Sequence, residues 1–110
     1  MFPHHETLEV YGAALELAGW LVALPGGKDL SCRLCRQIDE GVTSIVLNIA
    51  EGNGRYSELD HRRFLNLAEG SAVKVAAYLD LAVQKRALVQ AESDPGKQLL
   101  GRILAMLSRM

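Results

Sequence analysis

The stretch that decides the fold is Ser44-Ile-Val-Leu-Asn-Ile-Ala-Glu-Gly-Asn-Gly-Arg-Tyr-Ser57, followed directly by Glu58-Leu-Asp-His-Arg-Arg-Phe-Leu-Asn-Leu-Ala-Glu-Gly-Ser-Ala72. Apolar residues recur at helical spacing on both sides of Gly52-Asn53-Gly54. Glycine and asparagine tolerate the positive φ angles that a tight corner can require. Because the corner is so short, the two helices are expected to pack as antiparallel neighbours in a helical bundle.

The rest of the chain predicts two more helices, one before and one after this pair. Pro25-Gly26-Gly27 would end the first helix, since proline cannot continue a helix and glycine accepts the left-handed cap. Ser57 with Asp60 resembles a capping box, and Asp94-Pro95 reads as an N-cap followed by a first-turn proline. The expected helices cover about 5–24, from Asp29 or Ser31 to Gly52, about 58–92, and from 94 to the end. The prediction is an all-α, antiparallel, up-down-up-down four-helix bundle.

Each predicted helix carries one apolar stripe. The stripes are Leu8, Tyr11, Leu15, Ala18 and Val22; Leu34, Ile38, Val42, Ile45 and Ile49; Phe64, Ala68, Ala72, Val75, Leu79 and Ala82; and Leu99, Leu100, Ile103, Leu104, Met106, Leu107 and Met110. Other apolar residues lie beside these stripes, namely Trp20, Leu21, Val46, Leu47, Leu65 and Leu67. They either flank the core or form a second face that another subunit covers, and we expect a homo-oligomer.

Length and composition limit the classes to which the protein can belong. A chain of 110 residues predicts one domain, 1–110. Apolar residues make up 49% and aromatic residues only 5%, which suits close-packed helices better than a sheet. The net charge of −1 gives no global attraction to nucleic acid or to an anionic membrane. The chain has no apolar run of about 20 residues and no signal-peptide pattern at its start, so a cytoplasmic protein without a membrane span is expected.

Few residues point to catalysis or to a metal. Cys32-Arg33-Leu34-Cys35 is a C-x-x-C pattern, but a second cysteine pair is missing, so half-buried cysteines are favoured over a zinc or redox site. Gly52-Asn53-Gly54-Arg55 has the glycines of a phosphate loop, yet it follows a helix and lacks the Lys-Ser/Thr ending. Glu51 with Asp60 or Glu69 would be a carboxylate pair, although exposed helix charges are commoner. We expect no enzyme activity, no cofactor and no metal.

Asn48 and Glu51 lie at the edge of the second stripe. A buried amide must be hydrogen-bonded, so Asn48 is expected to bond to backbone or to a polar residue of the next helix. Glu51 can pair with Arg55, Arg62 or Arg63. The favoured interpretation is a polar network that fixes the helix register, and the alternative is a contact to a ligand or nucleic acid.

These residues also carry a family resemblance. The pattern consists of Gln37, Ser44, Asn48-Ile49-Ala50-Glu51-Gly52, Gly54-Arg55, Phe64-Leu65 and Ala68-x-Gly70-Ser71. It resembles the "four helix bundle protein" family, also called the intervening-sequence proteins of 23S ribosomal RNA genes. It is similar as well to the accessory variability proteins of diversity-generating retroelements. The resemblance implies a small antiparallel bundle that forms a ring, commonly a homopentamer, and, for the retroelement branch, a role around RNA or reverse transcriptase.

The chain departs from the family pattern in its charges. Family members usually carry a basic pair after Gln37, where this chain has Asp39 and Glu40. Glu69 stands where arginine is frequent, and Lys74 stands at a usually acidic position. The change at Glu69 and Lys74 looks like a charge exchange that would preserve an interaction between helices or subunits. Loss of the basic pair weakens a nucleic-acid role, because phosphate binding depends on Lys and Arg.

Two function classes therefore remain. The first is a non-catalytic accessory module for RNA, DNA or a nucleic-acid enzyme, whose candidate contacts are Arg33, Arg36, Arg55, Arg62 and Arg63. The second is a structural or protein-interaction scaffold, in which these arginines form salt bridges. The net charge favours the scaffold, and the resemblance favours RNA. Gly70 lies inside a long helix, so we predict that it serves close packing and that Gly70→Leu disrupts folding or assembly.

Overall fold

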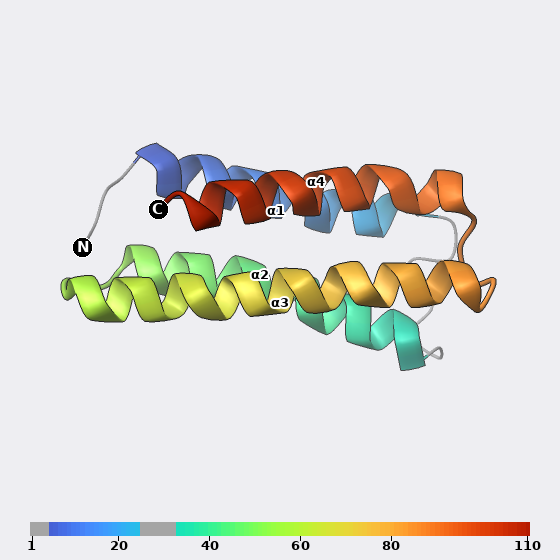
Figure 1. Cartoon of the computed structure of the whole chain (residues 1–110), viewed down its shortest axis with the longest axis horizontal. Helices are drawn as coiled ribbons and strands as arrows, with labels where there is room; N and C mark the ends of the chain where they lie inside the picture. Colours follow the sequence, from blue (N-terminus) through green and yellow to red (C-terminus); the bar gives the residue numbers. More distant parts are fainter. Residues whose placement is uncertain (1–4, 25–32) are drawn as a thin grey trace.

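The computed structural model describes residues 5–24 and 33–110, and within these ranges the chain forms four α-helices. They are α1 (His5–Ala23), α2 (Arg33–Asn53), α3 (Glu58–Gln84) and α4 (Gln90–Ser108). Successive helices run in opposite directions, with α1 and α4 forming one layer and α2 and α3 the other (Figure 1). The predicted all-α four-helix bundle is confirmed.

The helices pack as a square. α1 contacts α2 and α4, and α3 contacts the same two helices. In the described part of the chain α1 and α3 share no packing, so these two helices lie on a diagonal. The α2–α3 corner lies at the same end of the bundle as the C-terminus, and the α3–α4 corner lies at the opposite end (Figure 1).

One buried stripe from each helix forms the core. The buried apolar residues are Val10, Ala13, Ala14, Leu17 and Leu21; Ile38, Val42, Ile45 and Ile49; Leu65, Ala68, Ala72, Val75, Leu79 and Ala82; and Leu100, Ile103 and Leu107. Two glycines let neighbouring helices approach closely. A Cβ at Gly41 would lie 2.5 Å from the Val75 side chain, and a Cβ at Gly96 would overlap the Trp20 ring. These contacts pin α2 to α3 and α1 to α4.

The prediction for the first stripe was wrong. Leu8, Leu15 and Val22 are exposed, Tyr11 and Ala18 are half-buried, and the core is made by Val10, Ala13, Ala14, Leu17 and Leu21. The physical reason is that α1 is apolar on both sides, so helical spacing alone fits either side. A smaller correction applies to α3, where Leu65 is buried and Phe64 only half-buried. Of the residues beside the stripes, Leu21 is buried, Trp20 and Val46 are half-buried, and Leu47 and Leu67 are exposed.

The corner between α3 and α4 also differs from the prediction. α3 begins after the predicted cap Ser57, whose Oγ accepts a 3.3 Å hydrogen bond from the Asp60 backbone N–H. It ends at Gln84 rather than near residue 92, and Arg86 adopts a positive φ of 62° in the turn. α4 begins at Gln90 instead of at Asp94, because Glu92 Oε1 accepts a 2.9 Å bond from the Val89 N–H and closes the first turn there.

Some predictions fall outside the described residues, including the turn at Pro25-Gly26-Gly27, the caps Asp29 and Ser31, and Cys32. Among the four helices described, none combines the length and the apolar character that crossing a bilayer requires.

Candidate functional site at the corner between α2 and α3

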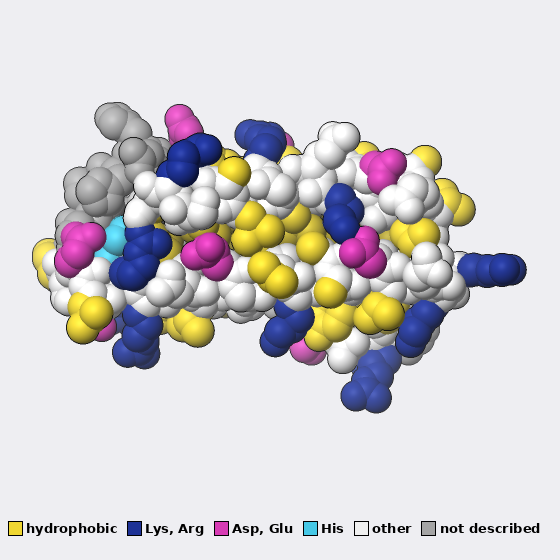
Figure 2. Space-filling view, viewed as in Figure 1, with side chains coloured by type: hydrophobic (Ala, Val, Ile, Leu, Met, Phe, Trp, Pro, Cys, Tyr) yellow, Lys and Arg dark blue, Asp and Glu magenta, His cyan; other side chains and the backbone are white. Residues whose placement is uncertain are grey.

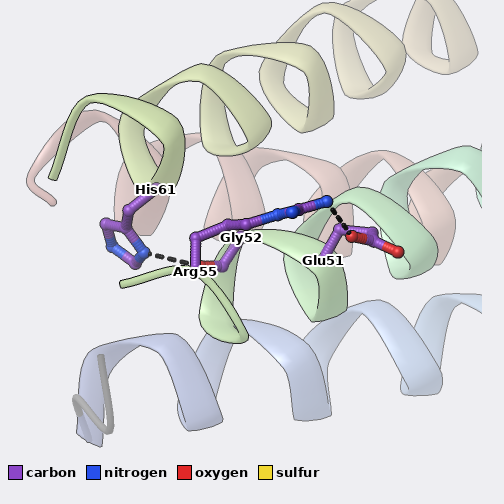
Figure 3. Close-up of polar contacts among 4 residues, drawn as sticks. All are labelled: Glu51, Gly52, Arg55 and His61. Atoms are coloured by element: carbon purple, nitrogen blue, oxygen red, sulfur yellow. Dashed lines mark hydrogen bonds and ion pairs between the residues drawn. The ribbon is translucent and has the colours of Figure 1, made fainter. Parts of the chain in front are cut away.

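His61 joins the two helices at the corner. The residue is 4% exposed, and its Nδ1 lies 2.9 Å from the Gly52 carbonyl oxygen, which accepts the hydrogen bond (Figure 3). A Cβ at Gly52 would lie 3.2 Å from the Phe64 Cβ and 3.3 Å from the His61 carbonyl oxygen. Glycine at this position therefore allows the end of α2 to lie tightly against the start of α3.

Arg55 is held at the same corner by two contacts. Its Nη2 donates a 2.7 Å hydrogen bond to Glu51 Oε2, one turn earlier on α2 (Figure 3). Its guanidinium also lies 4.7 Å from the centre of the Phe64 ring, and that of Arg63 lies 5.3 Å from the same ring. Both distances are within the range of a cation–π contact. Beside this cluster the Tyr56 side chain is 86% exposed.

The five arginines predicted to contact nucleic acid form two groups. Arg55, Arg62 and Arg63 lie at the α2–α3 corner, whereas Arg33 and Arg36 lie at the opposite end of α2. α2 has 21 residues and is therefore about 30 Å long. A single phosphate-binding patch cannot include all five residues, and only the corner group brings three of them together.

The family-motif residues line the seam between α2 and α3. Ser44 Oγ and Ser71 Oγ are 2.8 Å apart, and Asn48 Nδ2 donates to the Ser44 carbonyl at 2.9 Å and to Ser44 Oγ at 3.1 Å. A polar groove of about 240 Å³ lies beside this network, and its lining consists of Gln37, Glu40, Gly41, Ser44, Ser71, Lys74 and Tyr78. Asn48 therefore bonds to the backbone and side chain of Ser44 on its own helix, and Ser44 is the residue that connects this network to Ser71 across the seam.

The groove also brings Lys74 close to an acidic residue of the same chain, while the predicted charge exchange between helices or subunits stays a prediction. Glu69 and Lys74 are five residues apart on α3, so they project from different sides of the helix. Lys74 instead shares the groove with Glu40 of α2.

The remaining motif glycines have different surroundings. The Gly54 N–H donates 3.2 Å bonds to the carbonyls of Ala50 and Glu51, which ends α2. A Cβ at Gly70 would meet nothing within 4 Å, and the residue is exposed. Gly70 therefore serves no close packing within the described part of the chain, because its helix turns this position outward, and its role in packing between copies stays a prediction.

Two residues considered for other chemistries, Cys35 and Glu51, lie within the described part of the chain. Cys35 is half-buried, and across residues 5–24 and 33–110 no group of three His, Cys, Asp or Glu side chains could hold a metal ion. Glu51, considered as one member of a carboxylate pair, forms its ion pair with Arg55.

Sequence reasoning missed one surface. It assigned Leu8, Leu15 and Val22 to the core, yet they lie exposed along the outside of α1. The signal that could have revealed this was the pair Gly12 and Gly19, which lie between the three residues on the same side of the helix.

The comparisons with known proteins agree with this fold. The family model of the 23S rRNA-intervening sequence protein matches residues 6–109. The crystal structure of a protein of unknown function from the S23 ribosomal protein family of Bacteroides thetaiotaomicron is similar, with a TM-score of 0.87 and 22% identity. That match covers 94% of this chain and 96% of the other. No curated protein matches the chain. Because the family model spans nearly every residue, the chain belongs to the 23S rRNA-intervening sequence protein family.

Proposed function

We propose that the protein is a non-catalytic module that assembles with copies of itself and serves a nucleic acid or a nucleic-acid enzyme. The observation that carries this proposal is the corner cluster, in which Arg55 and Arg63 lie over the Phe64 ring and Arg62 precedes Arg63 in the first turns of α3. Arginine side chains bind phosphates, and repetition of a weak site around an oligomer raises its overall affinity. The family name refers to ribosomal RNA, and a role near that RNA would place the protein in the cytoplasm.

The resemblance to this family supports a ring, and a homopentamer is the assembly it implies. Exposed apolar side chains on three of the helices support self-association as well, since they include Leu8, Leu15, Val22, Leu47, Leu67, Val73 and Leu81. Sedimentation velocity of the purified chain measures the mass of the assembly. A monomer at all concentrations would contradict this part of the proposal.

Nucleic-acid binding is tested by fluorescence anisotropy with labelled single-stranded and duplex RNA and DNA at two salt concentrations. The test variant is Arg62→Ala with Arg63→Ala, because Arg55 is engaged by Glu51 and its loss would also alter the corner. Lys85→Ala with Arg102→Ala removes the same charge from exposed positions away from the corner and is the matched control. We expect binding that weakens with salt, and a smaller salt slope in the test variant only.

A scaffold without nucleic-acid binding is the second candidate. The net charge is −1, and acidic and basic side chains are interspersed over the face that α3 and α4 present in Figure 2. Glu51 also neutralises Arg55 at the corner. If neither RNA nor DNA binds at low salt, the scaffold is the supported function.

A further inference from the structure

The outer surface of α1 carries an apolar line. Leu8, Leu15 and Val22 are 58%, 47% and 57% exposed, and their spacing of seven residues places them on one side of the helix. Gly12 and Gly19 lie between them, and a Cβ at either position would meet nothing within 4 Å. We call these five residues the α1 stripe.

On the opposite side of α1, Val10, Ala14 and Leu17 are buried in the core of the same chain. A helix that is apolar on both sides is usually covered on both sides. Glycine weakens an exposed helix, so two glycines in one outward line indicate that another backbone approaches there. The α1 stripe therefore has the character of a contact surface.

α3 carries a comparable line on its own outer surface. Leu67, Gly70, Lys74, Ala77 and Leu81 follow one another in steps of three and four residues, so they share one side of the helix. Leu67 and Leu81 are 48% and 45% exposed, and the space above Gly70 is open. We call these five residues the α3 stripe.

The two stripes belong to opposite sides of the molecule. α1 and α3 lie on a diagonal of the square, and each packs against α2 and α4, so their outer surfaces face away from each other. A surface that pairs with its own copy produces a closed dimer. Two different surfaces on opposite sides instead let each copy contact two neighbours, which generates a ring or a filament.

The charges beside the two stripes differ in sign, apart from the half-buried Asp60, which lies on the same side of α3 as Arg63 and Leu67. The sequence of α1 contains no Lys or Arg, and Glu9 and Glu16 are exposed on it. The α3 stripe contains Lys74, and Arg63 lies exposed one turn before Leu67. The acidic Asp80 of α3 forms an ion pair with Lys97 of α4. Glu16 lies 3.7 Å from Arg102, but exposed pairs of this length are weak and do not hold the carboxylate away from another partner.

We propose that the α1 stripe of one copy docks on the α3 stripe of the next copy, head to tail. The inference rests on the self-assembly in the proposed function and adds which two surfaces meet. Leucines and glycines of the two stripes form the contact, and Glu9 and Glu16 of one copy face Arg63 and Lys74 of the other. Such complementarity fixes the direction of the assembly, because α1 against α1 would bring acidic residues together.

Two variants, studied alone and as a mixture, test this contact. Leu15→Glu disrupts the α1 stripe and leaves the α3 stripe intact, and Leu67→Glu does the reverse. In sedimentation velocity we expect each variant alone to have the 12.0 kDa mass of one chain. We expect the equimolar mixture to have twice that mass and to form nothing larger. The mixture restores a single intact contact, so the assembly stops at two chains. Ala105→Glu, at an exposed position of α4 outside both stripes, is the matched control and should assemble like the wild type.

The outcomes separate the two proposals. A monomeric wild type overturns self-assembly itself, and with it this contact. A wild-type oligomer that survives both substitutions overturns only the docking of the two stripes. Dimers of Leu67→Glu alone would instead indicate an α1-to-α1 contact, and dimers of Leu15→Glu alone an α3-to-α3 contact.

Charge reversal provides a second test that leaves the apolar residues in place. Glu9→Lys with Glu16→Lys should raise the dissociation constant of the assembly at least about tenfold, and Arg63→Glu with Lys74→Glu should do the same. Combining all four changes in one chain should restore assembly, because the signs are again opposite. If the combined chain assembles no better than either double variant, the proposed pairing is wrong.

Discussion

The effect of a glycine in this protein depends on what lies above it, and Gly96 and Gly101 of α4 show the two extremes. A Cβ at Gly96 would overlap the Trp20 ring, whereas a Cβ at Gly101 would meet nothing within 4 Å. We predict that Gly96→Ala lowers the free energy of unfolding by about 1–3 kcal/mol through overpacking. Gly101→Ala should raise it by up to about 1 kcal/mol through helix propensity. Urea denaturation measures both, and equal effects would contradict the close contact between α1 and α4.

Gly70 separates folding from assembly. Its exposed position means that Gly70→Ala should raise the unfolding free energy of a monomeric chain by about 1 kcal/mol, which urea titration of the Leu15→Glu background measures. Gly70→Leu should leave the helical circular dichroism signal unchanged while lowering the mass found by sedimentation. Loss of folded structure in Gly70→Leu would contradict this interpretation of the position.

At the scale of single residues, the sequence predicted the contacts made close along the chain. The Ser57 cap and the Glu51–Arg55 pair join residues three or four positions apart, which one helical turn brings together whatever the rest of the chain does. The Gly52–His61 bond and the Arg55–Phe64 contact at the corner were not predicted. They depend on the path of the corner, which spacing does not specify.

At the scale of helices, the seam between α2 and α3 rests on a small hydrogen-bond network. Ser44 Oγ contacts both Ser71 Oγ and Asn48 Nδ2, so its removal affects two partners. We predict that Ser44→Ala and Ser71→Ala each lower the unfolding free energy by about 1 kcal/mol. The double variant should lose less unfolding free energy than the two single variants lose together, because both single changes remove the same shared hydrogen bond. Strict additivity in urea denaturation would show that the two hydroxyls act independently.

The boundaries of α3 and α4 show where reasoning about elements failed. Asp94-Pro95 has the sequence of a helix start, but the helix begins four residues earlier, where Glu92 caps the Val89 N–H. The turn before it depends on Arg86 in the left-handed region, a conformation that is unusual for arginine and that its sequence does not signal. Local capping patterns compete, and the path of the chain between packed helices decides which of them is used.

At the scale of the whole molecule, assembly should make the thermal stability depend on protein concentration. Association of folded chains stabilises them by mass action, so the apparent Tm should rise with protein concentration. We predict this rise for the wild type and its absence for Leu15→Glu, with differential scanning fluorimetry over a hundredfold range of concentration as the measurement. A concentration-independent wild-type Tm would contradict the prediction, because folded chains that associate and separate on unfolding must be stabilised by mass action.

The sequence by itself determined the four helices, their antiparallel order and the family, because periodicity and tight corners act over short distances and the motif is dense around Asn48 and Gly52. The tertiary structure decided which side of α1 is buried, that the predicted arginines form two groups, and that Glu40 faces the same groove as Lys74. The physical reason is that helical spacing defines sides of a helix but not their partners. For an apolar helix such as α1, only the packing of the other three helices selects the side that enters the core.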